Sequence, residues 1–578
     1  MRSGAHWTAY TDADDRELTF EREHEAVERF ETPAATSIVG ASLSRDGSRI
    51  QLRGEKHNEA SEFYHTLPGS RWSLAAMCWQ VDATPASAWR IMEHCPVAVE
   101  ADEPILALAS SFARSLKWQT NGQPPTRKLD AWRHQLEAYH FAYKKTGALL
   151  AMDMGTGKSR VAIDLILNRD ARTTLILCPV SVLPVWRREF EKHADEPVDV
   201  LILDKGSVAK KAVNARLHVD KCTRLNRRAV VAINYESAWR EAFAQWSLSV
   251  PWDYAVLDES HRVKSHNSKV SKYAAKLGKV AKYRIALTGT PMPHSPLDLF
   301  GQFRFLDRGL FGTWFHHFRN RYARVNEMFP SQVLQWLNQD ELKERMALIT
   351  YRVGAEVLDL PEALHHRRSY TLSGKGKQVY QQLEGELIAD VEGGTVTAAN
   401  ALVRLLRLQQ ATSGYAVLDE TQEVIEVDDG KRFLLLELLD DMDPSEPVVV
   451  FCRFRHDLDV VQGVAEKLGR THGELSGRVK DALTDRGTMA EGVQVAGVQI
   501  QAGGVGIDLT RARYAVYFSV GFSLGEYLQS LARVHRPGQT RTTHYYHLVA
   551  SGTVDEAVYG ALKSRQQVVE SVLEVLKR

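Results

Sequence analysis

The chain has 578 residues, of which 44% are hydrophobic and 25% are charged, and its formal net charge is only +1. A chain of this length exceeds what one hydrophobic core can serve, so we expect about three to five domains. The absence of any run of about 18 apolar residues excludes a membrane-spanning helix, and five scattered cysteines without a C-x-x-C pair argue against structural zinc and a disulfide framework.

The first part of the chain predicts a polar arm followed by a small α+β module. Residues 1–36 are polar and mixed in charge, and no role is assigned to this arm. In residues 37–118, Arg45-Asp-Gly47 separates two strand-like stretches, which predicts a hairpin. The elements predicted for the module are strands at Ala41–Ser44, Arg49–Arg53 and Met77–Val81, and helices at Asn58–Thr66 and, capped by Thr84, Pro85–His94.

Two tryptophans in this module admit two interpretations. Trp72 follows Arg71, and Trp79 lies in the next predicted strand. Aromatic rings beside a basic residue stack on unpaired bases in nucleic-acid-binding proteins. Tryptophans are also usually core residues, and core packing is the favoured interpretation.

After a linker at 119–127, rich in Gly, Pro and polar residues, the chain predicts a phosphate-binding loop. The stretch Gly147–Ser159 reads GALLAMDMGTGKS: an apolar strand, a glycine-rich turn and the start of a helix. Gly155 and Gly157 let backbone N–H groups point at phosphate oxygens, Lys158 adds a positive charge, and the Ser159 hydroxyl suits Mg²⁺. Met152 stands where the strict pattern has glycine.

A pair of carboxylates follows one of the buried strands predicted for the same α/β unit. Asp258-Glu-Ser-His261 comes directly after Tyr254–Leu257, and Thr-Gly-Thr-Pro291 follows about thirty residues later. Ligands of parallel α/β sheets bind at the carboxyl ends of strands, so we expect Asp258 to hold Mg²⁺ and Glu259 to orient the attacking water. The strands predicted for this unit are Ala148–Ala151, Thr174–Cys178, Val198–Leu203, Ala229–Ile233, Tyr254–Leu257 and Arg284–Leu287.

The alternation of apolar strands with helix-length segments stops at about residue 300 and resumes near residue 447. Residues 301–430 are rich in aromatic side chains and predict a mostly helical segment, with helical core as the expected role of Phe303 to Trp336. A second α/β unit is predicted in 431–578, with strands at Pro447–Phe451, Val498–Ile500, Ala515–Phe518 and His544–Leu548.

Ordered motifs across about three-quarters of the chain resemble those of superfamily 2 helicases, and specifically of the SNF2-type DNA translocases. The resembling stretches are 151–159 (motif I), 175–190 (Ia), 232–236, 258–261 (II), 287–291 (III), 351–361, 448–453 (IV), 501–510 (V) and 529–539 (VI). In addition, LPGSRWSLAAMCWQV at 67–81 resembles the module that precedes the motor in HARP-type annealing helicases, which is associated with branched DNA junctions.

The chain departs from the family pattern at several positions. Asp508 replaces the usual asparagine in motif V, and Pro537 replaces an aliphatic residue in motif VI. The negative charge of Asp508 argues against a direct phosphate contact there. Arg133 stands where the family prefers proline, two residues before the candidate adenine reader Gln135.

The resemblance implies two RecA-like lobes whose parallel sheets form an ATP cleft, together with a helical insert and a small α+β N-terminal module. The implied divisions are an arm at 1–36, a HARP-like DNA-junction module at 37–118, a linker at 119–127, lobe 1 at 128–300, an insert and inter-lobe connection at 301–430, and lobe 2 at 431–578.

It also implies the roles of individual residues. The expected catalytic residues are Lys158, Glu259, Arg533 and Arg536, the two arginines acting as fingers from lobe 2. Nucleotide binding is expected at Gln135, Met154, Gly155, Thr156, Gly157, Lys158, Ser159 and Gly506, and Mg²⁺ binding at Ser159 and Asp258. Coupling of nucleotide state to movement is expected at Thr288, Thr290 and Gln529, and DNA phosphate contact at Ser181, Asn234 and Thr510.

The function implied is an ATP-dependent, Mg²⁺-requiring DNA translocase that moves along duplex or branched DNA without reading its sequence. The alternatives are a strand-separating DNA or RNA helicase, the motor subunit of a larger complex, and a nucleotide-gated DNA-binding scaffold. Neither zinc nor a membrane is an expected partner. The first residues lack the apolar run of a secretory signal, so we expect a cytoplasmic protein, bacterial or acting in a virus-infected cell.

Overall fold

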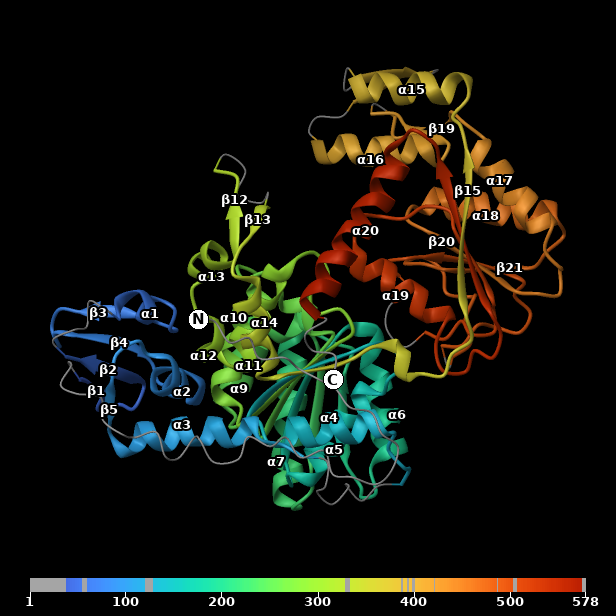
Figure 1. Ribbon diagram of the computed structural model, residues 1–578. Coiled ribbons are helices and arrows are strands. Elements are labelled where there is room, and N and C mark those ends of the chain that lie inside the picture. The colour runs from blue at the N-terminus through green and yellow to red at the C-terminus, as the bar shows by residue number, and fades with distance from the viewer. Residues whose placement is uncertain are drawn as a thin grey trace, which may run out of the picture.

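The computed structural model describes residues 38–54, 60–119, 128–327, 333–385, 388–391, 394–397, 401–419, 421–485, 487–502 and 507–573. The predicted arm, linker positions 120–127 and Gly506 lie outside these described residues. Three bodies built on separate sheets are visible (Figure 1): a small one at the left, a larger one at the lower centre and a third at the upper right. No helix in the described ranges is long and apolar enough to cross a membrane.

The N-terminal module is a five-stranded sheet with three helices. Its strands are β1 (Val39–Leu43), β2 (Arg49–Arg53), β3 (Arg71–Ser73), β4 (Cys78–Asp82) and β5 (Val99–Ala101), and its helices are α1 (Ser61–His65), α2 (Pro85–His94) and α3 (Glu103–Leu116). The strand order is β3-β4-β2-β1-β5, with β5 parallel to β1 and the other pairs antiparallel. The predicted hairpin and the Thr84 cap are confirmed: Thr84 Oγ1 accepts a hydrogen bond from the Ser87 N–H.

The tryptophans of this module are packing residues. Trp79 is buried in the module core, and Trp72 packs edge-to-face on it with ring centroids 6.0 Å apart. The core interpretation is therefore confirmed for Trp79, whereas Trp72 is half-buried at the edge of that core.

The first lobe is built on a seven-stranded, fully parallel sheet of order β14-β6-β11-β10-β7-β9-β8. Its strands are β6 (Gly147–Met152), β7 (Thr173–Cys178), β8 (Asp199–Leu203), β9 (Ala229–Asn234), β10 (Tyr254–Asp258), β11 (Tyr283–Thr288) and β14 (Thr350–Val353). Its helices are α4 (Arg133–Tyr143), α5 (Lys158–Asn168), α6 (Leu183–His193), α7 (Val208–Arg224), α8 (Tyr235–Ala238), α9 (Glu241–Ser249) and α10 (Lys269–Val280). The central strands are buried on both faces, which explains their continuous apolar sequences.

The second lobe has a six-stranded parallel sheet of order β15-β24-β23-β20-β22-β21. Its strands are β15 (Ala363–Tyr370), β20 (Val448–Cys452), β21 (His472–Leu475), β22 (Val495–Gln499), β23 (Tyr514–Tyr517) and β24 (Thr543–Ala550). Its helices include α17 (Gly430–Asp440), α18 (Arg455–Lys467), α19 (Leu524–Val534) and α20 (Val554–Leu573). Two parallel α/β sheets confirm the predicted fold class.

Residues 301–430 contain more strand than the sequence predicted. Helices α11 (Leu299–Leu306), α12 (Arg308–Phe311) and α13 (Phe315–Tyr322) bury Phe303, Phe305 and Phe318 as expected, but Trp314 is 64% exposed. A hairpin of β12 (Ala323–Val325) and β13 (Val333–Trp336) and helix α14 (Gln339–Ala347) follow. The remaining elements are β16 (Ile388–Val391), β17 (Gly394–Thr397), β18 (Tyr415–Val417), β19 (Val424–Glu426), α15 (Gly374–Gly385) and α16 (Ala401–Thr412).

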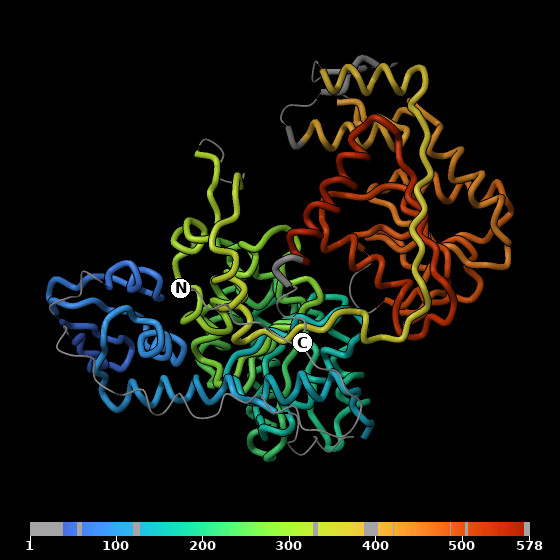
Figure 2. The backbone as a smooth tube through the Cα atoms, viewed as in Figure 1, coloured from blue at the N-terminus to red at the C-terminus, as the bar shows by residue number. Residues whose placement is uncertain are grey.

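Two strands in this region belong to the large sheets. β14 forms one edge of the first lobe's sheet, and β15 forms one edge of the second. Figure 2 traces the chain as it leaves the first lobe and runs along the second as β15. β15 reads ALHHRRSY and is largely solvent-accessible, so it lacks the apolar run of a central strand and was not predicted.

The N-terminal module is docked on the first lobe. Arg90 in α2 donates to the backbone oxygen of Gly309 in α12, at 3.5 Å. Ala86 and Phe112 belong to the hydrophobic core that also holds first-lobe residues. The module and the first lobe therefore share buried surface.

Candidate active site

The predicted phosphate-binding loop joins β6 to α5 at the carboxyl edge of the first lobe's sheet. Gly155 and Gly157 have φ values of +85° and +86°, a conformation that a side chain disfavours. Thr156 is fully buried, and its hydroxyl donates to the Asp153 carbonyl oxygen at 2.7 Å. Lys158 Nζ donates to the Met152 carbonyl oxygen at 2.8 Å, so its ammonium lies inside the loop, where phosphate oxygens would compete for it. Met154 and Ser159 are half-buried on the same loop.

The two carboxylates lie at the end of β10, two strands away from β6 in the same sheet: Asp258 is the last residue of the strand and Glu259 follows it. Asp258 is buried at the strand end, where its Oδ2 accepts a hydrogen bond from Trp186 Nε1 at 3.1 Å. Its Oδ1 accepts the Glu259 N–H at 3.0 Å. Because parallel strands end at the same edge, Asp258 and the phosphate-binding loop face the same space.

Glu259 occupies the position expected of a general base. Its φ of +52° is uncommon for a residue with a side chain, and it is only 3% exposed. His261 Nδ1 lies 3.4 Å from Glu259 Oε2 and 3.3 Å from Thr288 Oγ1. Thr288 Oγ1 also accepts the Thr290 N–H at 3.0 Å. The predicted coupling threonines therefore reach Glu259 through His261.

The two buried carboxylates perturb each other's ionisation. Burial, with a contribution from neighbouring Glu259, raises the pKa of Asp258 to about 7. Burial also acts to raise the pKa of Glu259, but His261, Lys158 and Arg533 outweigh it and hold this pKa below its ordinary value. A deprotonated Glu259 suits a base that accepts a proton from water.

The second lobe brings Arg533 close enough to this carboxylate to lower its pKa. Arg533, on α19, is 2% exposed, and its Nε and Nη2 have no hydrogen-bond partner within the described parts of the chain. Burial lowers the pKa of Arg533 to about 10, while Glu259 acts to raise it. Arg536 Nη1 donates to the Ile507 carbonyl oxygen at 2.9 Å, and its Nε is buried without a partner in the same described ranges.

The lobes touch at two further places in this cleft. A Cβ added to Gly155 would lie 2.6 Å from Pro537 Cδ in the second lobe. A Cβ added to Gly525 in α19 would lie 3.0 Å from Pro293 Cβ, in the loop after Thr290. Gln529 lies half-buried on α19.

Gln135 contacts the phosphate-binding loop. Its Oε1 accepts the Trp132 N–H at 3.0 Å, and its Nε2 donates to the Thr156 carbonyl oxygen at 3.1 Å. His134 Nε2 lies 2.9 Å from the same oxygen. Both side chains therefore brace the loop, and adenine recognition by Gln135 stays a prediction.

The three candidate phosphate contacts stay predictions, and two of them, Asn234 and Thr510, make hydrogen bonds within the chain. Asn234 is buried, and its amide is occupied by Lys211 at 3.4 Å and Glu236 at 2.9 Å. The Thr510 hydroxyl donates to Asp508 Oδ1 at 2.7 Å. Ser181 is exposed and remains a candidate.

Sequence reasoning assigned no role to several residues that shape the site. Trp186 holds Asp258 Oδ2, and the Tyr235 hydroxyl donates to the Asp258 carbonyl oxygen at 2.8 Å. Gln302 accepts from the Ser260 hydroxyl at 2.7 Å and donates to the Pro291 carbonyl oxygen at 2.7 Å, which joins the segments at 258–261 and 287–291. Because these residues lie far along the chain from the residues that they contact, no local sequence pattern indicates their part in the site.

Comparison with known proteins identifies the family. Residues 50–415 match the SNF2-related domain, and residues 430–538 match the helicase conserved C-terminal domain. A Caenorhabditis elegans homolog of SWI/SNF-related matrix-associated actin-dependent regulator of chromatin subfamily A-like protein 1 is 26% identical, with 94% of this chain and 78% of that protein covered.

Two other relatives match a smaller share of their own length. The Bacillus subtilis putative ATP-dependent helicase/translocase YwqA is 26% identical over 74% of this chain and 46% of its own. The DNA annealing helicase and endonuclease ZRANB3 of Bos taurus is 25% identical over 76% of this chain and 40% of its own. The chain thus spans less than half the length of these two. The chain belongs to the SNF2-related family of helicase-like ATPases.

Proposed function

We propose that this protein hydrolyses ATP with Mg²⁺ to translocate along DNA, and that it acts on duplex or branched DNA in fork remodelling or strand annealing. The observation that carries the proposal is a set of buried polar atoms without hydrogen-bond partners among the described residues: Glu259 Oε2 in the first lobe, and Arg533 Nε and Nη2 in the second. Two guanidinium nitrogens of Arg533 are buried without partners within the described residues, yet its charge lowers the pKa of Glu259. Unpaired buried donors at a catalytic carboxylate suit a developing phosphate charge.

The residues present fit a magnesium nucleotide. Ser159 and Asp258 would hold Mg²⁺, which would neutralise phosphate charge when bound. The N–H groups of the loop at 154–157 and Lys158 Nζ would hold the phosphates, and Glu259 would orient the attacking water and take its proton. Arg533 and Arg536 would stabilise charge on the transferred phosphoryl group.

The contacts across the cleft support a coupling of hydrolysis to movement. Arg533 can act only when α19 lies close to β10, so hydrolysis would require the lobes to be together. The contact of Gly525 with Pro293 places α19 against the loop after Thr290, which connects through Thr288 and His261 to Glu259. Conversion of bound ATP to ADP would thereby change how closely the two lobes pack together. Because both lobes would contact the DNA backbone, this change would move one contact relative to the other.

The first test is the rate of ATP hydrolysis by the intact chain without nucleic acid and with single-stranded DNA, blunt duplex DNA, forked DNA or RNA. We expect strong stimulation by duplex or forked DNA and displacement of a third strand from a DNA triplex. Stimulation by single strands or RNA alone would instead indicate a strand-separating helicase. No hydrolysis with any of them would overturn the proposal and favour a scaffold.

Two variants test the chemistry directly. Lys158→Ala should abolish hydrolysis by weakening nucleotide binding, whereas Glu259→Gln should abolish hydrolysis and retain binding of a fluorescent ATP analogue. Arg432→Ala, which changes an exposed second-lobe arginine paired with Glu426, is the control and should keep the wild-type rate. Appreciable turnover by Glu259→Gln would contradict its role as the base.

A further inference from the structure

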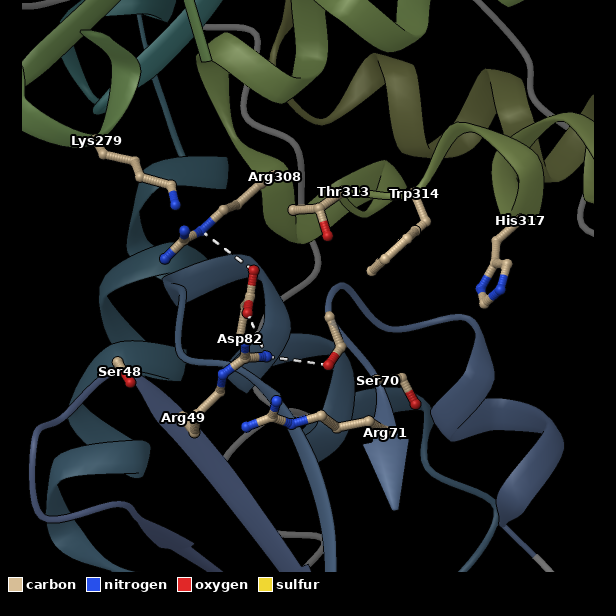
Figure 3. Close-up of a pocket in the computed structure, with 11 residues that line it drawn as sticks. Ser48, Arg49, Ser70, Arg71, Asp82, Lys279, Arg308, Thr313, Trp314 and His317 are labelled. Carbon is tan, nitrogen blue, oxygen red and sulfur yellow. Dashed lines mark hydrogen bonds and ion pairs between the residues drawn. The ribbon is translucent and has the colours of Figure 1, made fainter. Parts of the chain in front are cut away.

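A basic groove lies at the seam between the N-terminal module and the first lobe, away from the ATP cleft. Its cavity measures about 710 Å³. Figure 3 shows its two walls. Arg49, Ser70, Arg71 and Asp82 come from the module; opposite them, Lys279 comes from α10 of the first lobe, and Arg308 and Trp314 come from α12 and the loop after it, which pack on that lobe. Neither wall alone encloses the groove.

The walls are held together by an ion-pair bridge. Asp82 Oδ1 lies 2.6 Å from Arg49 Nη1 on its own side, and Asp82 Oδ2 lies 3.5 Å from Arg308 Nε on the other. Close packing beside this bridge adds to it, because a Cβ on Gly309 would meet the Thr84 side chain. The groove therefore has a fixed width rather than opening between independent bodies.

The groove carries an excess of positive charge. Four of its lining side chains are cationic, and Asp82 is the only carboxylate among the residues that line it. Arg71 Nη2 donates to the neutral amide of Gln80 at 3.0 Å, and Lys279 is exposed with no ion pair in the described parts of the chain. Two cations are thus free of a carboxylate and face the groove. Their natural ligand is an anion.

An aromatic face and a free hydroxyl complete the lining. Trp314 is 64% exposed, which is unusual for a tryptophan, and it lies on the loop between α12 and α13. Ser70 Oγ is buried and has no hydrogen-bond partner within the described residues. A flat aromatic ring among cations and hydroxyls matches a ligand with alternating planar bases and phosphates.

We propose that this seam binds an unpaired segment of nucleic acid, with a base stacked on Trp314 and flanking phosphates at Arg71 and Lys279. A base within a duplex is already stacked on both faces, so the ring selects unpaired bases. The inference extends the proposed function, since it places a single-strand site beside the motor. It assigns recognition to a groove made jointly by the module and the first lobe, rather than to Trp72 or Trp79.

The test measures binding of fluorescein-labelled oligothymidylate, oligouridylate and blunt duplex to the intact chain by anisotropy, with free thymidine monophosphate as a competitor. Trp314→Ala should weaken single-strand binding roughly tenfold, because stacking of one base contributes about 1–3 kcal/mol. Trp314→Phe should retain most of the affinity. Lys279→Glu should weaken binding and lower the salt slope by about 0.7, as for one phosphate contact on a single strand.

Lys276→Glu is the matched control, because Lys276 is exposed on the same helix α10 but does not line the groove. It should bind single strands as the wild type does. A photo-crosslinking strand containing 5-iododeoxyuridine should attach to the peptide that contains Trp314. A loss of affinity for DNA, for RNA or for both in the Trp314 and Lys279 variants supports binding of unpaired nucleic acid in the groove. The polymer whose binding weakens is the ligand of the groove.

The failure of this proposal is distinct from failure of the proposed function. Unchanged single-strand binding by Trp314→Ala and Lys279→Glu, with duplex-stimulated hydrolysis intact, would overturn the groove alone. If free thymidine monophosphate displaces the labelled strand as well as an unlabelled strand does at the same nucleotide concentration, the groove is a mononucleotide site. That result would also overturn the proposal. Absence of duplex-stimulated hydrolysis in the wild type, with single-strand binding sensitive to Trp314, would overturn the motor alone.

Discussion

Pro537 of the second lobe packs directly against Gly155 of the phosphate-binding loop in the first. A Cβ on Gly155 would lie 2.6 Å from Pro537 Cδ, and the φ of Gly155 is +85°. Gly155→Ala should therefore strain the loop by about 1–2 kcal/mol and push the lobes apart. We expect at least a tenfold loss of affinity for an ATP analogue, measured by calorimetry, and a larger loss of hydrolysis.

Two further variants separate strain from collision. Gly469→Ala places the same side chain at a φ of +66° with no atom within 4 Å, so it should leave nucleotide binding unchanged. Adding Pro537→Ala to Gly155→Ala should recover part of the lost hydrolysis. No recovery would show that the contact with Pro537 is not what limits Gly155.

Arg533→Ala should lower the DNA-stimulated rate of hydrolysis by about 10³-fold or more, while ATP and DNA still bind separately. The reason is that Arg533 presents unpaired guanidinium nitrogens near Glu259. Arg533→Lys keeps a charge but lacks the planar fork, so it should stay inactive. Steady-state kinetics with duplex DNA check this expectation, and a rate near wild type in either variant would refute the finger assignment.

The ion pair of Asp153 and Arg352 ties the phosphate-binding loop to the strand that leads toward the second lobe. Arg352 Nη1 lies 2.6 Å from Asp153 Oδ1, and Asp153 Oδ2 accepts the Ala355 N–H at 3.0 Å. Asp153→Asn and Arg352→Gln should each lower kcat about tenfold with a smaller change in KM. Because the two side chains share an ion pair, the loss in the double variant should be smaller than the sum of the two single losses, and additive losses would contradict the coupling.

Acid should destabilise the second lobe through His547. Burial, with the positive charge that His365 and His366 can carry, lowers the pKa of His547 to about 3. The folded state therefore binds fewer protons than the unfolded state, and the stability held above pH 6.5 is lost as the pH falls toward 3, by at most about 1.4 kcal/mol per unit.

Thermal unfolding midpoints measured between pH 7.5 and pH 5 test this dependence. His547→Phe should show a shallower fall than the wild type, because it removes the group that must stay neutral. His317→Gln changes an exposed histidine and should parallel the wild type. If the unfolding midpoint of His547→Phe falls with pH as steeply as that of the wild type, the pH dependence comes from other groups.

The predicted strands agree with the structure where strands are buried, and the strands at both edges of the second sheet were missed, although β8 at one edge of the first sheet was predicted as Val198–Leu203. β6, β7 and β10 are apolar throughout because both of their faces are covered. β15 and β21 form the two edges of the second sheet and carry polar residues, so their sequences resemble loops.

The sequence by itself determined the chemical groups of the candidate active site, because they lie in short segments where local order sets their geometry. Gly155 to Ser159 form a loop between a strand and a helix, and Asp258 and Glu259 follow the end of a strand. Such arrangements depend on residues close along the chain.

Only the tertiary structure decided which distant residues meet, since packing between elements leaves no periodic signal in either partner. It placed Trp186 on Asp258, Pro537 on Gly155 and Arg533 near Glu259. It buried Asn234 and exposed Trp314 at a seam that neither the module nor the first lobe contains alone.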